Sequence, residues 1–166
     1  MSVTKTQTGI VEPAKDTCPL FIVCQINLDR WLDSLPKAQQ NWVRETALPA
    51  KAGTCITLPS TDGHISAAAL ITDKNLIWES AGAASRLPAG SWAADLSFAG
   101  EADLSKIQLG WGLAQYHFAP HRPEKDPNNK AQLALAKTDQ DRGVHAQLKG
   151  IHIAREMINQ PANKMT

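Results

Sequence analysis

The chain has 166 residues, of which 43% are hydrophobic and 20% are charged, as in an ordinary globular domain. Seventeen basic and sixteen acidic residues give a formal net charge of +1, with no run of like charge. This balance argues against a dedicated nucleic-acid surface. No stretch approaches the roughly 20 consecutive apolar residues that span a membrane, so neither nucleic acid nor a membrane is expected as a partner.

The N-terminal residues 1–16 are polar and lack the apolar segment of a secretory signal, so they predict a flexible tail. The cysteines Cys18, Cys24 and Cys55 form no CxxC pair. An odd number of widely spaced cysteines predicts reduced thiols in a cytoplasmic protein. Cys24 and Cys55 lie within apolar runs and are expected to be inert core residues rather than nucleophiles.

The first half of the chain predicts a strand, a helix and a hairpin. Residues 19–26 are apolar and rich in β-branched side chains, which indicates a strand buried on both faces. Residues 35–46 have helical spacing, with Pro36 near the start, where a helix tolerates proline. Residues 53–58 and 65–72 flank an Asp-Gly turn and predict a hairpin. The Ala-Ala-Ala run in its second strand suits a helix by propensity, but its shortness and flanking turns favour a strand.

The second half alternates the same two kinds of element. Residues 76–86 predict a helix, residues 92–98 a strand and residues 102–116 a second helix. Residues 117–129 predict an exposed loop, residues 132–136 a brief strand and residues 138–158 a long final helix. A capping box from Thr138 to Asp141 is expected to begin the final helix. Strands that alternate with helices predict an α/β fold, with a mixed sheet flanked by helices on both faces.

The histidines invite a metal-site interpretation that the surrounding residues do not support. His117 and His121 have an i, i+4 spacing that could chelate a metal on a helix, but Pro120 lies between them in the expected loop. No HExxH motif is present. His145 and His152 lie seven residues apart on the final helix, where they could line an interface or simply border the core.

Other catalytic signatures are also missing from the sequence. It contains no Gly-x-Ser-x-Gly elbow and neither of the two common phosphate-binding glycine motifs. Five tryptophans are spread along the chain without a basic patch, and core packing is expected for four of them. We therefore predict no catalytic, cofactor-binding or metal-ligating residue in this chain.

The C-terminal residues carry the most information. A helix is expected to run to about Ile158, followed by the turn Asn159-Gln160-Pro161-Ala162-Asn163. This string resembles the junction in the leucyl (cytosol) aminopeptidase family of metallopeptidases, which joins an N-terminal domain to a catalytic domain. Two further segments resemble that family in the same order: Arg86–Trp92, with its Leu-Pro-x-Gly-aromatic step, and Leu109–Phe118, with its Tyr-x-Phe ending.

The resemblance implies a macro-domain-like α/β fold over residues 17–158. Residues 159–166 would begin the linker to an absent catalytic domain, with Asn159, Pro161, Ala162 and Asn163 as the domain junction. It also implies a cytoplasmic, hexameric parent enzyme with two divalent metals, zinc or manganese, that removes N-terminal amino acids from peptides. A metal-activated water would attack the peptide carbonyl.

In that case, the metal ligands would lie in the catalytic domain, which would be the partner of this chain. The 166 residues would bind no metal and would be inactive alone. They would support assembly of the homo-oligomer or shape substrate access. By fold analogy, the alternative is a stand-alone macro-like module that binds ADP-ribose or a related nucleotide. The missing glycine-rich pyrophosphate loop argues against this alternative.

Overall fold

A single six-stranded sheet organises the protein in the computed structural model, which describes residues 8–116 and 130–159. The strand order is β1-β6-β5-β2-β4-β3, and every neighbouring pair is parallel except β3 with β4. The strands are β1 (Ile10–Val11), β2 (Cys18–Cys24), β3 (Cys55–Pro59), β4 (Ile65–Thr72), β5 (Gly90–Phe98) and β6 (Ala131–Ala134).

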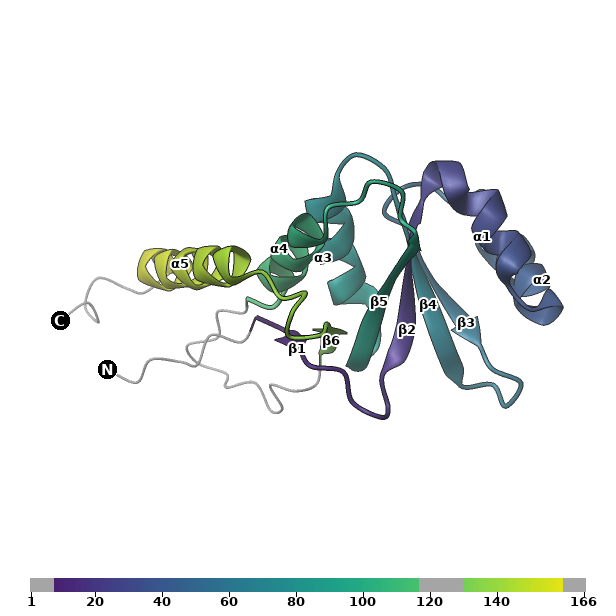
Figure 1. Ribbon diagram of the computed structural model, residues 1–166, viewed down its shortest axis with the longest axis horizontal. Coiled ribbons are helices and arrows are strands. Elements are labelled where there is room, and N and C mark those ends of the chain that lie inside the picture. Colours follow the sequence, from purple (N-terminus) through teal and green to yellow (C-terminus); the bar gives the residue numbers. More distant parts are fainter. Residues whose placement is uncertain (1–7, 117–129, 160–166) are drawn as a thin grey trace.

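Helices cover both faces of this sheet (Figure 1). They are the short 3-10 helix η1 (Gln25–Asn27), α1 (Leu28–Ser34), α2 (Lys37–Thr46), α3 (Leu76–Arg86), α4 (Leu104–Ala114) and α5 (Arg142–Asn159). Helices α1 and α2 lie on one side and α3 and α4 on the other, whereas α5 extends from α4 away from the sheet (Figure 1). The predicted α/β fold, with a mixed sheet between helices, is confirmed.

Two separate cores follow from the alternation of side chains along the strands. In β4, Ala68 and Leu70 belong to the cluster under α3 and α4, while Ala69 and Ile71 belong to the cluster under α1 and α2. All four are fully buried. A strand with both faces covered needs continuous apolar sequence, which explains why the alanine run forms a strand despite its helical propensity.

The tail predicted over residues 1–16 contains a paired segment. Ile10 and Val11 form β1, which runs parallel to β6. The amides of Leu133 and Leu135 donate to the carbonyl oxygens of Gly9 and Val11 at 2.7 and 2.9 Å. The edge of β6 needs partners for its backbone groups, and this need is met by residues more than 100 positions earlier, beyond the reach of local sequence patterns.

The boundaries of the early helices also differ from the prediction. The sequence pattern missed α1, because a seven-residue helix offers too few periodic positions to be recognised. Leu35 is extended, as expected for a residue before proline. Pro36 then occupies the N-cap position of α2, which begins at Lys37 rather than at residue 35.

Three of the five tryptophans are buried, so the expectation of four was wrong. Trp31, Trp92 and Trp111 lie in the two cores, whereas Trp42 and Trp78 are 44% and 71% exposed.

Trp42 lies against the outer edge of the sheet. Its indole Nε1 donates to the carbonyl oxygen of Thr57 in β3 at 3.1 Å. Gln39, also on α2, donates to the carbonyl oxygen of Pro59 at 3.1 Å. Unpaired backbone groups on an edge strand can template pairing with another chain. These two side chains therefore close the edge that β3 would otherwise present.

We expect Trp42→Phe to lower the free energy of unfolding by about 1 kcal/mol, because one hydrogen bond is lost while the aromatic ring is kept. It should also increase self-association through β3. Urea denaturation measures the first effect and sedimentation velocity the second. Trp78→Phe is the matched control and should stay within about 0.5 kcal/mol of the parent chain. Equal stability and equal self-association in the two variants would contradict the edge-closing role.

Candidate functional site

Helix α4 brings the other helices of its layer together through two glycines. Gly110 and Gly112 are separated by about 200° around the helix, so they lie on opposite faces. A Cβ at Gly110 would overlap the backbone carbonyl of Ile77 in α3, and one at Gly112 would overlap the methyl groups of Leu148 in α5. The Gly-Trp-Gly segment therefore permits close approach of a helix on each side of α4.

Hydrogen bonds from side chains of α4 anchor the start of β6 and the segment that follows this strand. The indole of Trp111 donates to the carbonyl oxygen of Ala131 at 3.2 Å. Gln108 is 1% exposed; its Nε2 donates to the carbonyl oxygen of Asp139 and its Oε1 accepts from the amide of Asp141, both at 3.0 Å. Because the amide of Gln108 satisfies one acceptor and one donor, it holds the chain where α5 begins.

A second set of contacts joins the residues just after α4 to α5. We call its residues the Tyr116 cluster: Tyr116, His152, Arg155 and Asn159. The Tyr116 ring lies 5.4 Å from the His152 ring, and the Arg155 guanidinium lies 5.4 Å from the centre of the Tyr116 ring. Asn159 Nδ2 donates to the Tyr116 hydroxyl at 3.2 Å. One aromatic side chain thus contacts three residues spread over two turns of α5.

His152 also bonds the backbone of α4 directly. Its Nε2 lies 3.2 Å from the carbonyl oxygen of Gly112, and only 5% of the residue is exposed. Burial is the main cause of its lowered pKa. The structure buries His152 between α4 and α5 of the same chain, so it borders the interior, and a role at an interface with another chain stays a prediction. His145 lies closer to the start of α5, and His117 and His121 lie outside the described residues.

The other face of α5 exposes apolar side chains. Ile153, Met157 and Ile158 are 43%, 60% and 81% exposed, whereas Val144 and Leu148 are buried. Of the predicted junction residues, Asn159 ends α5 and bonds Tyr116. Pro161, Ala162 and Asn163 lie outside the described residues, so their role as a hinge stays a prediction.

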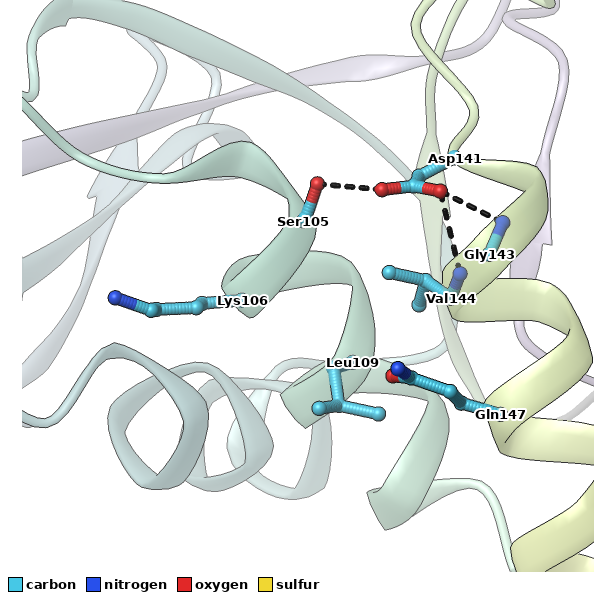
Figure 2. Close-up of a pocket in the computed structure, with 7 residues that line it drawn as sticks. All are labelled: Ser105, Lys106, Leu109, Asp141, Gly143, Val144 and Gln147. Atoms are coloured by element: carbon cyan, nitrogen blue, oxygen red, sulfur yellow. Dashed lines mark hydrogen bonds between the residues drawn. The ribbon is translucent and has the colours of Figure 1, made fainter.

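A shallow pocket of about 220 Å³ lies between the N-terminal ends of α4 and α5 (Figure 2). Its lining residues come from these two helices and from the residue before α5: Ser105, Lys106, Leu109, Asp141, Gly143, Val144 and Gln147.

Asp141 provides the main polar contacts of this pocket. The Ser105 hydroxyl donates to its Oδ2 at 2.7 Å, and the amides of Gly143 and Val144 donate to its Oδ1 at 2.7 and 3.3 Å (Figure 2). Asp141 is therefore the N-cap of α5. The predicted capping box at Thr138 was wrong. The Ser105 hydroxyl on α4 and the amides of Gly143 and Val144 in α5 donate to the carboxylate of Asp141 instead.

The hydrogen bond from Ser105 holds the pKa of Asp141 below its usual value, with help from the amides of Val144 and Gly143. A carboxylate stabilised in its charged form is a poor proton donor near neutral pH. Lys106, on the opposite wall, pairs with Asp103 at 3.8 Å. The pocket is therefore better suited to joining two helices than to acid–base chemistry.

The described cysteines are free thiols in partly buried positions. Burial raises the pKa of Cys55 to about 11, against a smaller opposing effect of Arg86. Because the thiolate is the nucleophilic form, Cys55 is unreactive at neutral pH, as its place in a strand predicted.

Over residues 8–116 and 130–159, no group of three His, Cys, Asp or Glu side chains could hold a metal ion. In the same residues, no helix combines the length and apolarity needed to cross a membrane.

Residues 18–136 match the family described as the M17 aminopeptidase, N-terminal domain. The chain belongs to this family. A crystal structure of cytosol aminopeptidase from Coxiella burnetii has the same fold as this M17 domain, with a TM-score of 0.80 and 26% identity. The alignment covers 95% of this chain and 34% of that one. A comparison with curated proteins found no match.

Two structures of the bottromycin maturation enzyme BotP, one of them in complex with Mn, share the fold alone. Their TM-scores are both 0.58, at 17% and 18% identity, and they cover 90% and 92% of this chain. Each alignment takes in 34% of the BotP chain. This M17 domain thus spans about a third of the length of the solved structures it matches.

The motifs that suggested this family have physical roles in the M17 domain. In the Arg86–Trp92 segment, the Arg86 guanidinium donates to the carbonyl oxygen of Gly53 at 2.9 Å, and the Trp92 indole donates to that of Pro88 at 3.1 Å. The second motif contains the two glycines of α4 and Tyr116. Sequence reasoning missed Gln108 and Ser105, whose partners lie more than 30 residues away.

We expect Ser105→Ala to raise the pKa of Asp141 in this M17 domain toward its ordinary value, because the hydroxyl is the largest stabiliser of the carboxylate. Carboxyl-detected NMR titration measures the change. A folded-state pKa below the unfolded one gives stability at higher pH that is lost as the pH falls through the folded pKa. The variant should therefore lose less stability in acid. Lys106→Gln is the control, and an unchanged Asp141 pKa in Ser105→Ala would refute the assignment.

Proposed function

We propose that this chain is the non-catalytic N-terminal domain of a dinuclear-metal leucyl aminopeptidase and that it places and supports an adjoining catalytic domain. The alignment of 95% of the chain with 34% of the Coxiella cytosol aminopeptidase carries this proposal. The direction of α5 supports it: the helix leaves the sheet and ends at Asn159, the first residue of the junction motif (Figure 1).

By this proposal, the complete enzyme removes N-terminal amino acids from peptides in the cytoplasm. Two zinc or manganese ions in the catalytic domain would polarise the peptide carbonyl and activate the attacking water. The enzyme would form a hexamer, and this domain would contribute either to its assembly or to the access of substrate.

A domain exchange tests the placement of the chemistry. The chain alone should give no turnover of a leucyl chromogenic substrate with added manganese. A chimera in which it replaces the aligned N-terminal third of the Coxiella enzyme should hydrolyse that substrate. Robust turnover by the chain alone would defeat the proposal, and so would a folded, metal-loaded chimera without activity when the Coxiella enzyme prepared in parallel is active.

A second comparison separates the two supporting roles. If the domain serves assembly, the Coxiella enzyme without its N-terminal third should form smaller oligomers by light scattering. If the domain shapes access, the oligomer should persist while kcat/KM changes more for long peptides than for a short chromogenic substrate. If the shortened enzyme keeps the oligomer of the full-length enzyme, and also the same ratio of kcat/KM for long peptides to kcat/KM for the chromogenic substrate, both roles are excluded.

ADP-ribose binding remains a prediction from fold analogy. The pocket between α4 and α5 presents the carboxylate of Asp141, and the lysine in its lining, Lys106, pairs with Asp103. A carboxylate disfavours a pyrophosphate, so this pocket gives the alternative no support. Calorimetry with ADP-ribose would decide, since micromolar binding would favour a nucleotide-binding module.

A further inference from the structure

One buried histidine bonds α5 directly to the backbone of α4. Because a carbonyl oxygen can only accept a hydrogen bond, the Nε2 of His152 must carry the proton that it shares with Gly112. In the neutral ring, Nδ1 is then the unprotonated nitrogen. A second proton would give the ring a full positive charge at a position where only 5% of the residue is exposed.

The charged groups near His152 do not compensate for this cost. Helix α4 contributes the Gly112 carbonyl oxygen, and the residues just after it contribute the Tyr116 ring; neither is charged. Helix α5 contributes Arg155, which opposes a second positive charge, and Glu156, which favours it. Burial has the largest effect on the pKa of His152 and lowers it, and Arg155 lowers it further. The hydrogen bond to Gly112 and the charge of Glu156 raise the pKa by less, so it lies below that of an ordinary histidine.

The same cluster makes contacts along the C-terminal half of α5. The ring of Tyr116 contacts both His152 and Arg155, and its hydroxyl accepts from Asn159. Arg155 also donates to the carbonyl oxygen of Leu113 at 3.3 Å. A charged imidazolium beside this ring would repel the Arg155 guanidinium, which contacts the same ring. Hydration of His152 would then require Tyr116 and the C-terminal half of α5 to separate.

We propose that the Tyr116 cluster is an acid-sensitive latch, which holds α5 in one direction while His152 is neutral and releases it when His152 is protonated. Protonation costs more in the latched than in the released state, so acid favours release. If the proposed function holds, the latch sets the orientation of the catalytic domain that follows α5. The latch itself lies within this chain and can be tested without that domain.

NMR of the intact 166-residue chain tests this inference. Residual dipolar couplings report the orientation of α5 relative to the sheet, and the ring signals report the protonation of His152. Because the pKa of His152 is lowered, the titration runs from about pH 7.5 to below about pH 5, the acid end of the ordinary histidine range. Over this range we expect α5 to become orientationally averaged. The contacts between Tyr116 and His152 should be lost with the same midpoint as the His152 titration. An α5 orientation that stays constant while His152 titrates would overturn the proposal.

Two variants isolate the histidine. His152→Gln keeps a donor for Gly112 but does not titrate, so it should abolish the change in α5 orientation between the two pH values. His145→Gln, on the same helix, should leave the transition intact. Amide spectra of the sheet establish that each variant is folded. Persistence of the transition in His152→Gln, or its loss in His145→Gln, would refute the assignment to His152, whereas inactivity of the chimera would refute only the proposed function.

Discussion

Replacing Gly110 with alanine is expected to lower the free energy of unfolding by about 3 kcal/mol or more, at the upper end of overpacking effects. The added methyl would overlap the carbonyl oxygen of Ile77 and the hydroxyl of Ser80. The carbonyl belongs to the backbone of α3 and cannot rotate away, so α3 and α4 must separate. For a chain of this length, the melting temperature should fall by about 6–12 °C.

Gly82→Ala is the matched control for this change, because Gly82 is also within a helix but has no atom within 4 Å of the position that an added methyl group would take. Alanine has the higher helix propensity, so this variant should gain about 0.5–1 kcal/mol. Chemical denaturation of both variants measures the difference. If Gly110→Ala proved as stable as Gly82→Ala, the close contact between α3 and α4 would be wrong.

Replacing Gly112 with alanine should displace α5 while leaving the sheet intact. The new methyl would overlap those of Leu148, a residue that is fully buried. We expect a loss of about 1–3 kcal/mol from overpacking and weaker contacts in the Tyr116 cluster, which depends on the same spacing between helices. Denaturation measures the loss, and residual dipolar couplings measure the reorientation of α5.

A double-mutant cycle tests whether Leu148 is the obstacle. Leu148→Ala alone should cost about 2–5 kcal/mol by leaving a cavity. In the Gly112→Ala background it should cost less, because the new methyl fills part of that space. Gly150→Ala, on α5 with no atom within 4 Å of its added methyl, should leave the helix in place. Additive losses in the cycle would mean that Gly112 and Leu148 do not interact.

The interior of the fold could be predicted from sequence because its signals are local. The apolar run at residues 19–26 predicts a strand buried on both faces, and β2 occupies residues 18–24 of the sheet. The Asp-Gly turn between residues 58 and 65 predicts a hairpin, and β3 pairs antiparallel with β4 around it. In each case neighbouring residues carry the whole pattern, either the two-residue period or the chemistry of a turn.

The candidate site was only partly visible from sequence. The Leu109–Phe118 motif indicated the family, but nothing in its order of residues showed that Gly110 faces α3 and Gly112 faces α5. Thr138 was the better cap by its local pattern, yet Asp141 caps α5 because Ser105 and Gln108 hold it from another helix.

The amino-acid sequence by itself determined the α/β class, most helices and strands and the aminopeptidase family, because these depend on short-range periodicity and on a few ordered motifs. Only the tertiary structure decided that Ile10 and Val11 extend the sheet and that Tyr116 joins His152, Arg155 and Asn159. Those contacts join segments separated by about 40 to more than 100 positions in the chain. Their energies depend on how closely the packed helices and strands approach, a distance that is absent from any local pattern.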